Sequence, residues 1–140
     1  MMKPKKLIAL FTIAAMSMIV SCSGNNGESS HMHDGSEHSM EPIHVELSWN
    51  PGDVSVNQKV VFEAVVTQGS EAVDDAKAVL FEIVNKNNEE DKQELEGKLS
   101  GNGTYKAEAI LMKEGNYDVT SHVTARTQHS MPTKEITVQP

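Results

Sequence analysis

The chain has 140 residues, with 12 Lys and Arg against 20 Asp and Glu, and it contains a single cysteine. One cysteine excludes an internal disulfide framework and a Cys-x-x-Cys redox centre. The acidic balance argues against nucleic-acid binding, because phosphate backbones attract basic surfaces.

The first predicted element is a signal peptide over residues 1–21. Lys3, Lys5 and Lys6 give it a basic start, and an uncharged apolar run follows over residues 7–20. A helix that crosses a bilayer needs about 20 apolar residues, so this run is too short to be one. Its length is typical of the apolar core of a secretory signal peptide.

The signal peptide ends at Ile19-Val20-Ser21-Cys22, which resembles the lipobox of bacterial lipoproteins. That resemblance implies cleavage before Cys22, a diacylglycerol on its sulfur, and palmitate among the acyl chains of the lipid. The protein would then be anchored in the cell membrane, facing the extracytoplasmic side. The alternative is an ordinary secretory leader, or an uncleaved anchor, with an incidental cysteine. Removal of the three leader lysines leaves 9 Lys and Arg against 20 acidic residues, a net charge of -11.

Residues 22–41 are predicted to be a disordered linker. They contain no Val, Ile, Leu or aromatic residue, so they cannot form a core. The linker nevertheless carries the metal-binding residue types His31, Met32, His33, His38 and Met40. Two interpretations stay open, a flexible metal-collecting arm and a solvated spacer.

Residues 42–140 are predicted to form one all-β domain. Alternation of apolar and polar residues with period 2 predicts half-buried strands. Strands are expected over residues 43–49, 59–67, 78–84, 95–99, 104–111, 117–125 and 134–138. The polar stretch 85–92 is expected to be a loop, with a helical turn as an alternative. About seven short strands separated by turn signals favour an immunoglobulin-like antiparallel β-sandwich.

Tyr117 follows a Gly-Asn turn and begins an alternating strand. This arrangement is typical of the tyrosine corner of such sandwiches. The alternative is that Tyr117 simply fills the core, and both interpretations place it inside.

Histidine and methionine cluster near the end of the domain. His122 lies on the face of its strand opposite the apolar face. On an extended segment His129 and Met131 point the same way, and Pro132 biases Met131 toward extended backbone. The pattern predicts that His122, His129 and Met131 converge at one end of the sandwich.

His44 is expected as a fourth ligand. It lies on the outer face of the first strand, and the first and last strands of such sandwiches are often neighbours. The alternative is that the linker supplies the fourth ligand. Imidazole and thioether together favour copper, since the soft thioether suits Cu(I) and zinc gains little from Met. The competing interpretation is that the His-x-Met triplet arose by chance and that His122 is only a surface residue of its strand.

Several segments resemble the YtkA-like domain of small exported lipoproteins, which are similar to FixH-type proteins associated with oxidase assembly. The segments are Thr67-Gln68-Gly69, Val73-Asp74-Asp75-Ala76, Val79-x-Phe81-Glu82-Ile83, Gly101-x-Gly103-x-Tyr105, Glu114-Gly115-x-Tyr117, and His122-Val123-Thr124-Ala125-Arg126 with His129-x-Met131-Pro132. The resemblance covers about residues 43–138. It implies an immunoglobulin-like sandwich outside the cytoplasm. The His-x-Met element also resembles that of periplasmic copper chaperones for cytochrome oxidase, although the spacing to the linker differs from theirs.

The preferred hypothesis is a lipid-tethered protein that buffers copper or delivers it to a membrane oxidase or its assembly factors. The alternative is a non-metal, immunoglobulin-like interaction module of the cell envelope. An enzyme is not expected, because no nucleophile lies beside a base in a suitable frame. Ser130 follows His129 directly, and adjacent side chains on an extended chain point apart.

Overall fold

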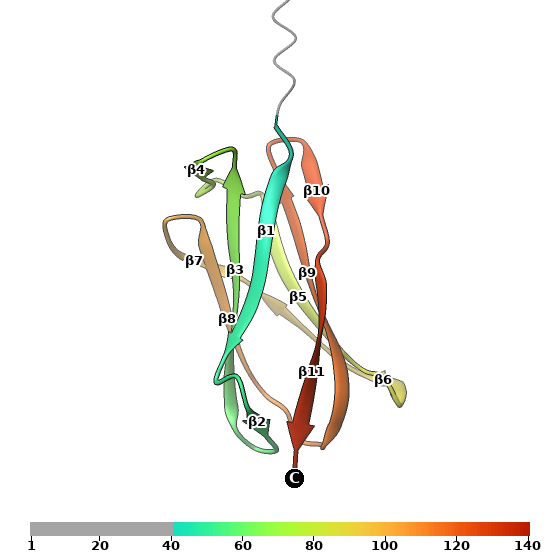
Figure 1. Cartoon of the computed structure of the whole chain (residues 1–140). Coiled ribbons are helices and arrows are strands. Elements are labelled where there is room, and N and C mark those ends of the chain that lie inside the picture. Colours follow the sequence, from blue (N-terminus) through green and yellow to red (C-terminus); the bar gives the residue numbers. More distant parts are fainter. Residues whose placement is uncertain (1–40) are drawn as a thin grey trace, which may run out of the picture. The chain divides into compact units, whose positions relative to one another are not determined.

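The structure is a computed structural model that describes residues 41–140. These residues form two β-sheets packed face to face, without an α-helix (Figure 1). The predicted antiparallel β-sandwich is confirmed. Within the described residues no helix could span a membrane. The predicted signal peptide, Cys22 and the linker residues up to 40 lie outside this range.

The first sheet has the strand order β1-β3-β8-β7, and β4 is attached to β3. All of its neighbouring strands are antiparallel. Its members are β1 (Ile43–Asn50), β3 (Lys59–Gln68), β4 (Glu71–Ala72), β7 (Lys98–Gly101) and β8 (Thr104–Ile110).

The second sheet has the order β2-β11-β9-β5-β6, and β10 continues the pairing along one edge of β9. Only the short β2 runs parallel to its neighbour, β11. Its members are β2 (Val54–Ser55), β5 (Ala78–Asn85), β6 (Asn88–Glu96), β9 (Gly115–Ala125), β10 (Gln128–Ser130) and β11 (Thr133–Gln139).

The core lies between the sheets, because every second residue of the long strands is buried there. Phe62 of β3 and Phe81 of β5 meet across the interface with ring centroids 6.2 Å apart. Trp49 packs against Phe62 from the same sheet, at 6.4 Å. Burial of one such large apolar side chain stabilises the fold by about 1.5–3 kcal/mol. The predicted inward face of β1 is confirmed, with Trp49 only partly buried.

The region between residues 85 and 99 differs from its prediction. The expected polar loop over 85–92 is wrong, because β6 begins at residue 88 and pairs with β5 as a hairpin. The expected strand 95–99 is divided at Gly97, so that its first part ends β6 and its second part begins β7 in the other sheet. A Cβ on Gly97 would lie 2.8 Å from a methyl group of Val79. A side chain at this crossing between the sheets would force Val79 to shift, so the position favours glycine.

Two tyrosine hydroxyls fasten loops to the sandwich. Tyr117 is buried, and its hydroxyl donates to the carbonyl of Lys113, 2.9 Å away, four residues earlier in the chain. This contact confirms the predicted tyrosine corner. Tyr105 has a comparable role that the sequence did not reveal: its hydroxyl donates to Val73 O at 2.9 Å and accepts from Ala76 N at 3.0 Å.

Candidate metal centre

A tight hairpin positions the last His and Met residues. The chain leaves β9 and enters β10 through the two residues Arg126 and Thr127, both with positive φ (47° and 67°). Two-residue hairpins favour this backbone because its twist matches that of the strands. Arg126 is held by Asp75, with Nε and Oδ1 3.3 Å apart, and by Gln68, with Nη1 and Oε1 2.8 Å apart. The hairpin therefore turns back at once, so that β10 lies along β9.

The register of this hairpin determines which side chains share a face. His129 is opposite Thr124, and β11 pairs with β9 further along in the same register. That register places Met131 opposite His122. Pro132 has no N–H group to donate, which explains why the ladder is interrupted between β10 and β11. The predicted common face of His122, His129 and Met131 thus agrees with the strand pairing.

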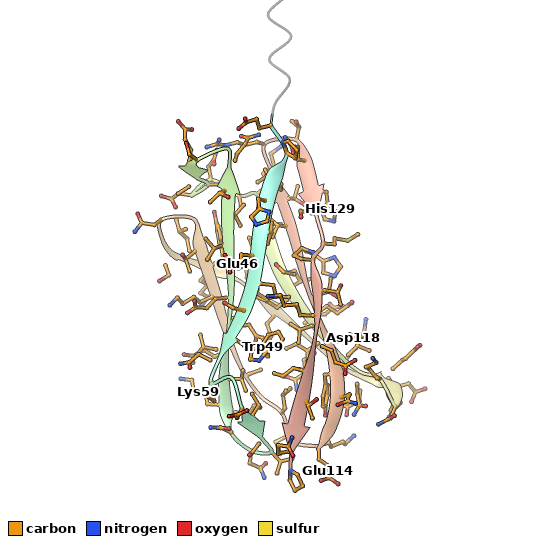
Figure 2. The ribbon with its side chains drawn as sticks, in the orientation of Figure 1. Glu46, Trp49, Lys59, Glu114, Asp118 and His129 are labelled. Carbon is orange, nitrogen blue, oxygen red and sulfur yellow. The ribbon has the colours of Figure 1, made fainter. Side chains whose placement is uncertain are left out.

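The two imidazoles face each other on the outer surface of the second sheet. The ring centroids of His122 and His129 are 6.4 Å apart, with 38° between the ring planes. Nδ1 of His129 lies 2.9 Å from the hydroxyl oxygen of Thr124. When Nδ1 donates this hydrogen bond, Nε2 keeps a free lone pair for a ligand. Figure 2 shows His129 projecting from β10 near one end of the sheet.

A third group at this site, Glu82, was missed by sequence reasoning. β5 is the neighbour of β9, and Glu82 Oε1 lies 3.7 Å from His122 Nε2. The two side chains are only 30% and 28% exposed. Within the described part of the chain, His122 Nε2 is buried and has no hydrogen-bond partner. The available signal was a lone acid between Phe81 and Ile83, in the middle of an otherwise apolar strand.

The other predicted ligands lie elsewhere or outside the described range. Met131 is 55% exposed and not part of the core, as expected. His44 is exposed on the outer face of the first sheet, opposite Thr67. β1 pairs with β3 and not with the last strand, so the pairing expected to bring His44 to the site is absent, although the start of β1 lies beside β10. The linker residues His31, Met32, His33, His38 and Met40 fall outside residues 41–140.

The start of β1 is fastened beside this hairpin. The side chain of Gln128 accepts a hydrogen bond from Ile43 N at 2.8 Å and donates one to Glu41 O at 3.0 Å. Gln128 directly precedes His129, so the first described residues lie next to β10 (Figure 1). This contact joins the entrance of the domain to the end of the sandwich that carries the histidine pair.

The side chains have not yet converged on one point. Among residues 41–140 no group of three or more His, Cys, Asp or Glu residues is gathered closely enough to hold a metal ion. Metal–imidazole bonds are about 2.0–2.1 Å long, so two rings that share one ion have centroids roughly 5 to 6.5 Å apart. The observed 6.4 Å lies at the upper end of that range. The distance between the two rings is therefore compatible with a shared ion.

Comparison with known proteins gives one family. A family model described as YtkA-like matches residues 37–122, which is more than half of the chain. The match ends at His122, so that His129 and Met131 lie beyond it. A comparison with curated proteins found no match.

Proposed function

This chain belongs to the YtkA-like family, and from that premise we propose that it is a lipid-tethered copper-binding protein of the cell envelope. It would buffer copper outside the cytoplasmic membrane or deliver it to a membrane oxidase or its assembly factors. The observation that carries the proposal is the His122–His129 pair, with ring centroids 6.4 Å apart, and Met131 opposite His122.

The chemistry of these donors supports copper over other metals. Imidazole binds both oxidation states of copper, and a thioether adds affinity for Cu(I). Mg²⁺ and Ca²⁺ prefer oxygen ligands, and Zn²⁺ gains little from methionine. His129 and Met131 are exposed. Exposure suits transfer, because a ligand of the receiving protein can reach the ion before the last donor leaves.

Cys22 supplies the membrane contact in this proposal. Two or more acyl chains, at about 0.8 kcal/mol for each buried methylene, anchor a protein stably. We expect a Cys22→Ala variant to leave the membrane fraction and to incorporate no labelled fatty acid. A variant that stays with the membrane without the label would show that the leader itself is the anchor.

Copper binding is tested by titrating the full-length protein, in detergent micelles, with Cu(I) in competition with a chromogenic chelator. We expect the His129→Ala, Met131→Ala double variant to bind Cu(I) at least about tenfold more weakly, a loss of about 1.4 kcal/mol. His44→Ala is the matched control, because it removes an imidazole from the other sheet. Equal Cu(I) affinity of the wild type and the double variant would overturn the proposal.

A second candidate is a non-metal interaction module, and an open groove of about 700 Å³ favours it. The groove lies where β6 and β7 meet β8, with Val61, Leu95 and Leu99 among its lining residues. Leu99 is 47% exposed and adds apolar surface to this groove. Pull-down of envelope proteins with and without a chelator separates the candidates, because only the copper role depends on metal.

A further inference from the structure

We propose that Glu82 completes, with His122 and His129, a site for Cu(II) on the outer face of the second sheet. This inference rests on the proposed copper-binding function and deepens it, since it adds a ligand and an oxidation state. Three strand segments supply the donors: β5 gives the carboxylate, β9 the first imidazole and β10 the second.

The contact between Glu82 and His122 is the main support. Oε1 and Nε2 are 3.7 Å apart, which is too long for a hydrogen bond and too short for an intervening water. A metal ion bonded to both atoms at about 2 Å would fit a separation close to 3 Å. The pair is therefore less than one ångström wider than a bridged pair.

The surroundings of the pair also favour a ligand. A buried nitrogen without a hydrogen-bond partner is desolvated without compensation, and a bound cation would provide that compensation. His122 Nε2 is such an atom within residues 41–140. Thr124 meanwhile orients the second ring through Nδ1 of His129, as the outer partners of metal-bound histidines do.

The two sides of His122 differ in the hardness of their donors. On the β5 side lies the carboxylate of Glu82, a hard oxygen donor. On the β10–β11 side the strand register places Met131, whose thioether is a soft donor. Two nitrogens with an oxygen form a tetragonal set that suits Cu(II), whereas nitrogen with sulfur suits Cu(I). The same histidine pair thus serves both oxidation states, with a different third ligand for each.

The test compares Glu82→Gln with Glu94→Gln in the full-length protein. Glu94 is the matched control, because it lies opposite Glu82 on the next strand and its substitution removes the same negative charge. Unlike Glu82, it forms an ion pair with Lys92 at 3.1 Å. In all proteins the linker residues His31, His33 and His38 are changed to Ala, so that they do not contribute nitrogen ligands. Affinities for Cu(II) and for Cu(I) are measured by chelator competition, and the ligands of Cu(II) by electron paramagnetic resonance.

We expect Glu82→Gln to weaken Cu(II) binding by about tenfold or more and to leave Cu(I) binding unchanged, while Glu94→Gln changes neither. Glu82→His should restore Cu(II) binding and add a third nitrogen to the resonance spectrum. Equal Cu(II) binding by wild type and Glu82→Gln, or equal losses in both variants, overturns this inference and leaves the copper function standing. Absence of binding of either ion to the wild type with its linker histidines intact overturns the function itself.

Discussion

At the scale of single residues, Tyr117 joins a local hydrogen bond to the burial of an ionisable group. Its hydroxyl donates to Lys113 O while the ring lies in the core. Burial, and secondarily the negative charge of Asp91, raises the pKa of Tyr117 above its ordinary value of 10.0. Tyr117 therefore both fastens the turn before β9 and makes the free energy of unfolding depend on pH in the alkaline range.

We expect Tyr117→Phe to lower the free energy of unfolding by about 1 kcal/mol at neutral pH, because one hydrogen bond is lost and the carbonyl of Lys113 loses its partner. Denaturation by urea, followed by the fluorescence of Trp49, measures this. Trp49 is the only tryptophan of the chain. An unchanged midpoint would mean that water replaces the hydroxyl without loss.

The same variant should respond less to alkali. Above about pH 10 the unfolded chain loses the Tyr117 proton while the folded chain keeps it, so the unfolded state binds fewer protons and the wild type loses stability as the pH rises. Phenylalanine does not titrate, so the difference between the two proteins should shrink between pH 9 and pH 11. A difference that grows over this range would show that folding favours the tyrosinate.

The roles of Gly97 and Glu82 could not be predicted from the sequence, because both depend on contacts with residues far away in the chain. Nothing in the sequence marks Gly97 as the crossing point between sheets, because its role depends on the close approach of Val79. Glu82 could be recognised as unusual within an apolar strand, but its partner His122 comes from a strand 40 residues later along the chain. Long-range pairing of strands, which periodicity does not encode, brings the two together.

At the scale of elements, the β9–β10 hairpin carries backbone strain next to the candidate site. Arg126 and Thr127 both adopt positive φ, a region that L-residues rarely occupy and that β-branched residues disfavour most. Strain of this kind, of the order of 1–3 kcal/mol for each residue, often persists near functional sites because surrounding contacts hold it. Here the side-chain contacts of Arg126 with Asp75 and Gln68 provide that hold.

We expect Thr127→Gly to raise the free energy of unfolding by about 1 kcal/mol, because glycine adopts positive φ without steric cost. Thermal unfolding measures the gain. Thr133→Gly is the control, because it places glycine in a regular strand of the same segment and should destabilise. A loss of stability in Thr127→Gly would show that the threonine side chain stabilises the turn.

The strands that sequence periodicity predicted correctly are those with one buried face. β1, β3, β5, β8 and β9 all alternate between buried and exposed residues, and the expected ranges agree to within two residues. β6 escaped prediction because it is an edge strand whose residues are almost all polar. Such a strand forms because it pairs with β5, and its sequence has no alternation of apolar and polar residues from which it could be predicted.

The candidate site was predictable in part for the same reason. Alternation correctly placed His122 on the outer face, and the extended stretch that follows carried His129 and Met131 to that face. The placement of His44 required knowing which strands are neighbours. Sheet order is set by contacts distant in sequence, so that expectation failed.

At the scale of the whole molecule, Phe62 is the central contact between the two layers. It is fully buried, and it touches both Trp49 in its own sheet and Phe81 in the opposite sheet. Apolar contacts of this kind hold the two layers of the sandwich together.

We expect Phe62→Ala to lower the free energy of unfolding by about 3–5 kcal/mol, from the lost burial and the cavity that remains. That is a large part of the 5–15 kcal/mol typical of a domain, so the variant should be close to unfolding at 37 °C. Val65→Ala on the outer face of the same strand is the control and should cost far less. Calorimetry measures both, and similar losses in the two variants would contradict the central role of Phe62.

β6 leaves one row of backbone N–H and C=O groups of the second sheet unpaired, and such an edge invites another chain to add a strand. The strand has the sequence Asn-Glu-Glu-Asp-Lys-Gln-Glu-Leu-Glu, with five acids in nine residues. Repulsion between two such acidic edges opposes their pairing, and so works against fibre formation between copies of the domain.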